Sequence, residues 1–390
     1  MSMAARSAGV GGKRLLGPDV SCFVGSAPGA WHGGQAPEWV LSNGSGCSPL
    51  RRYVWVDPQR CTKKVVSTVP GGGTSNLASC VQHDAAQLWS ELANTSVLML
   101  GDSTAAQVLW HACDAFSAHP KSLVRINSSV PLKKYAHRLR SLDNHACRLA
   151  ADITLGSFSH YGVAGPPYWV FAYPLPPWLA DNTPAMVREN VPRFRSVTKS
   201  GGDPTVIIAS SGFWDIAAWW AHEGNFTRRW SMLDHREGNH TERYVHGVHR
   251  MVREVRRTFP QSVVVWRLMH PGMKHSITPP IVRELNDAVR SAAQSWKLPL
   301  LDVEAMVSSL RPVAQPGLGR GPVYGTMDGR HLHPWLNIAL LNVLFNIVRT
   351  ARETRASRQA RNLLHGGPLA RRQRRATETA AAAHSDGPGE

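Results

Sequence analysis

Short apolar runs alternate with longer helical patterns through the middle of this chain, and this alternation constrains the fold more than any other feature. The runs are rich in β-branched residues, as expected for strands that are buried on both faces of a sheet. They are Ser96–Gly101 (SVLMLG), Thr205–Ser210 (TVIIAS), Ser262–Arg267 (SVVVWR) and the weaker Leu298–Asp302 (LPLLD). Strands separated by helices favour the α/β class, here a three-layer α/β/α sandwich with a central parallel sheet.

The segments between these runs predict helices over Thr104–Phe116, Thr241–Thr258 and Pro280–Trp296, and a last one from Trp335 to at least Val348. In Thr241–Thr258 the apolar side chains recur at helical spacing and leave a polar opposite face. Residues 156–184, rich in proline and aromatic residues, interrupt the alternation. We interpret them as a packed surface excursion or as a wall for a substrate.

Composition divides the 390 residues into four parts. Residues 1–20 are Gly/Ala/Ser-rich and are predicted to be disordered. Residues 21–92, rich in Cys, Trp and Gly, predict a loop-rich module packed on the α/β domain, which spans 93–350. Residues 351–390 are basic and then alanine-rich, which predicts a fraying helix and a disordered tail.

All six cysteines lie in the first 147 residues: Cys22, Cys47, Cys61, Cys80, Cys113 and Cys147. An even number clustered in this way predicts two or three disulfides that tie the N-terminal region, and hence an oxidising compartment. The absence of a Cys-x-x-Cys pair disfavours zinc, so we expect no metal.

The chain is strongly basic, with a formal net charge of +17. We expect no nucleic-acid partner, because the sequence contains no zinc-finger, RNP-like or basic heptad pattern. An acidic polysaccharide or an anionic membrane surface would be attracted equally well. The longest nearly apolar run, Leu336–Val348, is too short to cross a bilayer, so we expect no membrane span.

Ser103 is the first candidate for chemistry, since Gly101-Asp102-Ser103 falls where the first strand meets its helix. Active sites of parallel α/β sheets gather at the carboxyl ends of strands. A serine there lies at a helix N-terminus, whose N–H groups stabilise developing negative charge. The alternative is that the glycine makes the turn and Asp102 or Ser103 only caps the helix.

Asp328 and His331 form the second candidate, in a loop before the last helix. In this spacing the Asp328 carboxylate can hold His331 Nδ1–H while Nε2 faces a serine from another strand. The alternative is a pair of surface loop residues. His333 competes with His331 for the role of base.

Two further strand ends supply candidates for binding. Gly212 would let its backbone approach a substrate carbonyl, and Asp215 or Trp214 would orient the site. Arg267 ends another strand and would bind an acidic or hydroxylated substrate, or pair with Asp215. The alternative at Gly212 is a turn followed by a helix cap.

Together these residues resemble the GDSL/SGNH esterase superfamily, and most of all its PC-esterase branch, which includes the trichome-birefringence-like and NXPE-like glycan O-acetyltransferases. The GDS motif at 101–103 and the DxxH motif at 328–331 stand in that family's order. The resemblance covers about residues 22–350. It includes Gly29-Ala30-Trp31, the CSPLRRYVW stretch at 47–55, VVVWR at 263–267 and LLDVEAM at 300–306. The chain departs from the pattern where Trp214 replaces the superfamily's oxyanion Asn, and where Leu332-His333-Pro334-Trp335 replaces Trp-Cys after DxxH.

The resemblance implies a serine acyl-transfer enzyme with Ser103 as nucleophile, His331 as base and acid, and Asp328 as its orienting residue. The backbone of Ser103 and Gly212 would bind the oxyanion. We expect an O-acetyltransferase acting on a glycan. The alternatives are a carbohydrate O-acetyl esterase with the same triad and a non-catalytic glycan-binding protein.

No bound cofactor is expected, although acetyl-CoA is a candidate acyl donor. The expected location is the Golgi or another secretory lumen, or outside the cell, although no targeting segment is visible in the sequence.

Overall fold

A computed structural model describes most of the α/β part of the chain. The described residues are 29–32, 38–41, 85–116, 124–126, 144–160, 162–164, 184–222, 239–272, 279–308, 326, 329–332 and 334–364. The CSPLRRYVW stretch and the cysteines at positions 22, 47, 61 and 80 lie outside these residues, as do Asp328 and His333.

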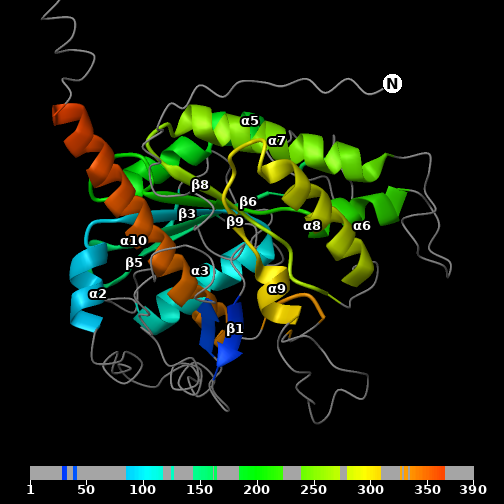
Figure 1. The fold of residues 1–390 in the computed structure, drawn as a ribbon, viewed down its shortest axis with the longest axis horizontal. Coiled ribbons are helices and arrows are strands. Elements are labelled where there is room, and N and C mark those ends of the chain that lie inside the picture. Colours follow the sequence, from blue (N-terminus) through cyan, green and yellow to red (C-terminus); the bar gives the residue numbers. More distant parts are fainter. Residues whose placement is uncertain are drawn as a thin grey trace, which may run out of the picture.

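A seven-stranded sheet forms the centre of the molecule, with strand order β4-β5-β6-β3-β7-β8-β9 (Figure 1). The strands are β3 Ser96–Gly101, β4 Val124–Arg125, β5 His145–Arg148, β6 Thr154–Ser159, β7 Val206–Ala209, β8 Val263–Arg267 and β9 Leu300–Leu301. The pairs from β6 through β3, β7 and β8 to β9 are parallel, whereas β4 and β5 join one edge in antiparallel pairing. The predicted α/β class with a central, mostly parallel sheet is confirmed.

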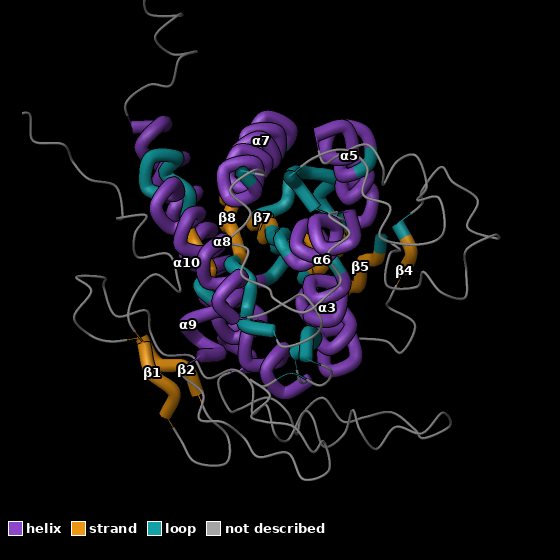
Figure 2. The backbone as a smooth tube through the Cα atoms, turned by 90° about the vertical axis from the view of Figure 1, so that its right-hand side faces the viewer, coloured by secondary structure: helices purple, strands orange, loops and turns teal. Residues whose placement is uncertain are grey.

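Helices cover both faces of this sheet and complete the three layers (Figure 2). One face bears α2 Ala85–Leu92, α3 Ser103–Phe116, α9 Val303–Ser308 and α10 Pro334–Leu364. The other bears α5 Pro184–Glu189, α6 Phe213–His222, α7 His240–Thr258 and α8 Pro279–Ala293, with the 3-10 turn η6 Val191–Val197. A second 3-10 turn, η5 Ala150–Asp152, precedes β6.

Strand β3 explains why two helical layers are needed. Its side chains alternate, with Val97 and Met99 packed in the cluster under α3 and α10, and Leu98 and Leu100 in the cluster under α7 and α8. All four are at most 3% exposed. A strand that is apolar on both sides is stable only when both sides are covered, which is the pattern of a parallel sheet.

Strand β6 corrects the interpretation of residues 156–184. Residues 156–159 form the second half of a central strand, and Pro184 begins α5; the intervening 165–183 lie outside the described residues. A Cβ built at Gly156 would lie 2.2 Å from Cε2 of Phe194. The strand therefore contains a glycine because the Phe194 ring of η6 occupies the space of a side chain.

Helix α10 continues to Leu364, and its Arg349 forms an ion pair of 2.9 Å with Glu91 of α2. Helix α2 thus packs against the α/β domain. Residues 29–32 and 38–41 of the predicted loop-rich module form an antiparallel pair, β1 Gly29–His32 and β2 Glu38–Leu41. Among the helices that the structure describes, none combines the length and apolarity that crossing a membrane requires.

A disulfide joins Cys113 of α3 to Cys147 of β5. This is one of the disulfides predicted among the six cysteines, and it lies within the α/β domain. It ties the helix that begins with Ser103 to the antiparallel edge of the sheet.

Candidate active site

The hydroxyl of Ser103 and the imidazole of His331 meet above the end of β3, with 2.8 Å between Oγ and Nε2. Ser103 is the first residue of α3, directly after the strand, and His331 lies in the loop before α10. The two are 228 positions apart in the sequence. With the imidazole protonated at Nδ1, Nε2 accepts the hydroxyl proton, which is the arrangement of a nucleophile and its base. The role of Asp328 stays a prediction, since that residue lies outside the described part of the chain.

Asp102 stabilises the turn between β3 and α3, where Ser103 lies. Its Oδ1 accepts hydrogen bonds from the backbone N–H of Thr104 (2.8 Å) and from the Thr104 hydroxyl (2.7 Å). This is helix N-capping, as the alternative interpretation of the motif proposed for Asp102. The cap and the nucleophile are compatible, because Asp102 bonds the backbone and leaves the Ser103 hydroxyl to His331.

Arg267 lies beneath this turn and not on a surface that a substrate would reach. It is 5% exposed, and its Nη1 donates to the Thr104 hydroxyl over 3.3 Å. Burial lowers the pKa of the guanidinium to about 10, while the charge of Asp102 acts in the opposite direction. Arg267 therefore remains charged at neutral pH and supports Asp102 through Thr104.

Gly212 comes immediately before α6, with φ of +125°. A Cβ at this position would lie 2.2 Å from Sδ of Met269, so the close approach of Met269 requires glycine as much as the backbone angle does. The residue before a helix and the first helical residue carry N–H groups that no preceding turn accepts. The N–H groups of Gly212 and Ser103 are thus the candidate oxyanion donors, as the sequence analysis expected.

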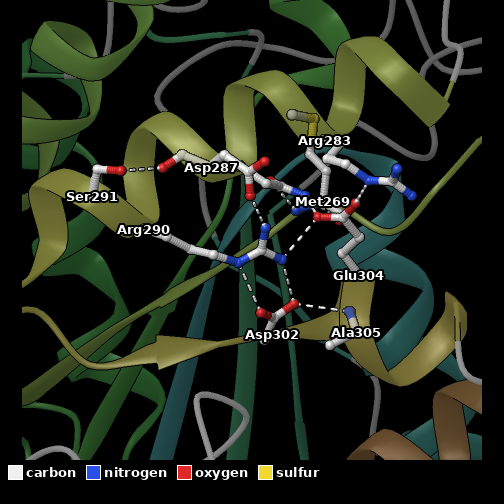
Figure 3. A network of polar contacts seen from close by, with 9 residues as sticks. Met269, Arg283, Asp287, Arg290, Ser291, Asp302, Glu304 and Ala305 are labelled. Atoms are coloured by element: carbon white, nitrogen blue, oxygen red, sulfur yellow. Dashed lines mark hydrogen bonds and ion pairs between the residues drawn. The ribbon is translucent and has the colours of Figure 1, made fainter.

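A polar network holds the backbone of Met269 in place through hydrogen bonds with Asn286 (Figure 3). The side-chain amide of Asn286 accepts from Met269 N (3.1 Å) and donates to Met269 O (2.8 Å), and it also donates to Glu304 (2.9 Å). Arg290 binds Asp302 through two nitrogens and Glu304 through one. The network joins α8 to the start of α9, so the residue that packs against Gly212 is held by two helices.

Asp215 is fully buried, and its carboxylate holds the backbone around the site. Oδ1 accepts from Val163 N (2.7 Å) and Ala164 N (2.8 Å), and Oδ2 accepts from the Ser211 hydroxyl (2.7 Å). Burial raises the pKa of this carboxyl, and the hydrogen bonds from Ser211 and the two N–H groups act against that rise. Asp215 thus joins the segment after β6 to the segment after β7, and its hydrogen bonds are to these segments and not to Arg267.

His270 is a residue of the site that the sequence analysis did not identify. It is completely buried after β8, and its Nε2–H donates to the carbonyl of Arg330 over 2.5 Å. Its ring meets Phe213 edge to face at 5.0 Å. Burial, helped by the charge of Arg267, lowers the pKa of His270 to about 3. A neutral imidazole therefore anchors the loop residue that precedes His331.

The other side of this loop is held from α10. The amide of Asn337 donates to the carbonyl of Leu332 (3.3 Å) and lies 3.0 Å from Nδ1 of His111. Burial lowers the pKa of His111 to about 4, so the imidazole is neutral at pH 7. In the tautomer that leaves Nδ1 without a proton, Nδ1 accepts from the Asn337 amide. Residues 330 and 332 are thus both anchored, which fixes His331 between them.

We expect His270→Gln to flatten the acid limb of the stability profile. The unfolded chain binds a proton at His270 near pH 6.5, whereas the folded protein does so only near pH 3. Stability is therefore lost as the pH falls from 6.5, with a slope of about 1.4 kcal/mol per pH unit from this group. Urea unfolding at several pH values measures the slope. His246→Gln, which replaces an exposed histidine of α7, is the control. Equal slopes for wild type and His270→Gln would contradict a neutral buried His270.

The comparisons with known proteins concern the fold alone. No family model matches the chain, and no curated protein is similar to it. Among solved structures, the chain is similar to a GDSL-like lipase from Bacteroides thetaiotaomicron, at 12% identity and a TM-score of 0.35, over 68% of this chain and 96% of that one. It is also similar to Est24, a carbohydrate acetylesterase from Sinorhizobium meliloti, at 14% identity and a TM-score of 0.34, over 66% of this chain and 99% of that one.

Proposed function

We propose that this protein is a serine-dependent acyl-transfer enzyme that forms an acyl ester on Ser103. The observation that supports this most directly is the 2.8 Å contact between Ser103 Oγ and His331 Nε2. The hydroxyl lies at the N-terminus of α3, next to N–H groups that can stabilise an oxyanion. A non-catalytic protein has no need for this pairing or for the anchors at Arg330 and Leu332.

In the proposed reaction, His331 Nε2 takes the proton of Ser103 while Oγ forms a bond to the acyl carbon. The N–H groups of Ser103 and Gly212 stabilise the oxyanion of the tetrahedral intermediate. When this intermediate collapses, the bond to the leaving oxygen breaks and His331 returns the proton to that oxygen. A second hydroxyl then attacks the acyl-Ser103 ester, with His331 again acting first as base and then as acid.

We further propose that the acyl group is acetyl and that the acceptor is a sugar hydroxyl of a glycan, with acetyl-CoA as a candidate donor. The resemblance of the GDS and DxxH motifs to the PC-esterase branch supports this choice. The second candidate is hydrolysis, in which water attacks the same acyl-serine. The Cys113–Cys147 bond supports a proposed location in an oxidising compartment such as the Golgi lumen.

The fate of a labelled acetyl group tests the proposal. The protein is incubated with radiolabelled acetyl-CoA or with an aryl acetate, with and without oligosaccharide, and the label is followed into sugar and into free acetate. A transferase should place label on the sugar in proportion to added acceptor. Free acetate released at a rate that is indifferent to sugar would leave an esterase. No turnover of either donor, with no labelling of Ser103 by a fluorophosphonate, would exclude both.

A further inference from the structure

Helices α5 and α7 pack side by side on one face of the sheet (Figures 1 and 2). A basic groove is lined by side chains of both helices. Its volume is about 510 Å³. The lining side chains are Arg188, His246, Arg250, Arg253, Glu254 and Arg257. None of these residues has a part in the site built around Ser103.

The described lining of the groove carries a net positive charge, because arginines outnumber acidic side chains in it. Glu254 is the single acidic side chain among the described residues of the lining; it lies 2.5 Å from Arg257 and 4.0 Å from Arg188. Arg250 and Arg253 are exposed, and within the described residues neither has an ion-pair partner.

The positive charges of the groove also affect the pKa of a neighbouring histidine, His249. The pKa of His249 is lowered, first by partial burial and then by the charges of Arg253, His246 and Arg256. The positive potential therefore extends beyond the lining residues.

Four of the lining side chains lie in a line along α7. Residues 246, 250, 253 and 257 follow each other at spacings of three and four, so they share one face of the helix. From the first to the last the rise is about 16 Å. A line of this length suits a linear polymer with repeated negative charges better than a single small anion. Arginine, which supplies three of the four positions, binds carboxylates and sulfates through two parallel hydrogen bonds.

We propose that this groove binds an anionic polysaccharide, and so defines the glycan substrate class as acidic. This step rests on the proposed function, because it takes the bound glycan to be the acyl acceptor. We favour a polysaccharide over a single-stranded nucleic acid, because none of the described residues that line the groove is aromatic and binding of single strands depends on stacking of bases on aromatic rings.

Helix α7 also contacts the segment that precedes Gly212. The hydroxyl of Tyr244, two residues before His246, donates to the carbonyl of Ser211 over 2.8 Å. The helix that carries the groove is therefore fixed to the segment that supplies a candidate oxyanion donor.

The experiment measures binding separately from catalysis. The full chain with Ser103→Ala is titrated with a polygalacturonate fragment, a neutral xylan fragment of the same length and poly(U), over a series of salt concentrations. We expect salt-dependent binding of polygalacturonate and none of xylan. Arg253→Glu should weaken this binding by about tenfold, the effect of losing one charge-assisted contact. The matched control is Arg355→Glu, the same change at an exposed arginine of α10 outside the groove.

The following outcomes would overturn the inference. Equal weakening by Arg253→Glu and Arg355→Glu would place the binding elsewhere. Equal affinity for xylan would remove the role of charge, and tight binding of poly(U) with the same loss in Arg253→Glu would make the ligand a nucleic acid. Because the Ser103→Ala protein cannot form an acyl-enzyme, failure of the proposed reaction leaves the binding result intact.

Discussion

Ser103→Ala should abolish acyl transfer, with a loss on the order of 10⁴-fold or more, while the fold stays intact. Without Oγ no acyl ester can form, and His331 has no proton to accept. The substitution removes one oxygen at a half-buried position at the start of a helix that Asp102 caps, so the melting temperature should change little. Release of nitrophenol from an aryl acetate measures the loss, and circular dichroism measures the fold.

His331→Ala tests the other half of the pair. The single variants and the double variant should be about equally inactive, because the two side chains act as one unit and their losses do not add. Ser308→Ala, which changes an exposed serine of α9, is the matched control and should retain full activity. Losses that multiply in the double variant, or substantial turnover by Ser103→Ala, would show that the 2.8 Å contact is not the catalytic pair.

The strands that sequence patterns could predict are those whose own side chains fill both layers of the core. The predicted run Ser96–Gly101 coincides with β3, and the runs for β7 and β8 differ from the strands by one residue at their ends. In each of these, apolar side chains point to both helical layers, so local sequence and tertiary environment agree.

Strand β6 could not be predicted because its character depends on distant residues. Its sequence, TLGSFS, contains a glycine and two serines, which are residues typical of loops. Gly156 is needed only because Phe194 packs against it, and nothing near position 156 reveals that ring. Tertiary packing therefore overrides strand propensity here.

The same limit applies within the candidate site. Ser103 could be singled out because a GDS turn after an apolar run is a local pattern, whereas His270 has no such pattern around it. Its role follows from burial and from the carbonyl of Arg330, a residue 60 positions away. Asp215 and Arg267 were singled out because they lie at strand ends, but only the structure shows that both are buried and bond the backbone or Thr104.

Asp215→Leu should be the most destabilising single substitution near the site. It leaves the N–H groups of Val163 and Ala164 and the hydroxyl of Ser211 buried without their acceptor. Each unsatisfied group costs about 1–3 kcal/mol, so the free energy of unfolding should fall by roughly 3–5 kcal/mol. For a chain of this size the melting temperature should drop by about 10 °C or more.

Asp215→Asn separates the loss of acceptors from the loss of charge. Asn Oδ1 can still accept from both N–H groups, and its Nδ2–H can donate to the Ser211 oxygen, so most of the stability should return. Burial raises the pKa of Asp215, which means that the folded state disfavours the charged form. Wild-type stability should therefore gain from protonation of this group at low pH, and Asp215→Asn should lack that gain. Calorimetry on the three proteins between pH 4 and pH 8 measures both effects, on top of the opposite contribution of His270. If Asp215→Asn were as unstable as Asp215→Leu, the buried charge itself, and not its role as an acceptor, would hold the segments after β6 and β7 together.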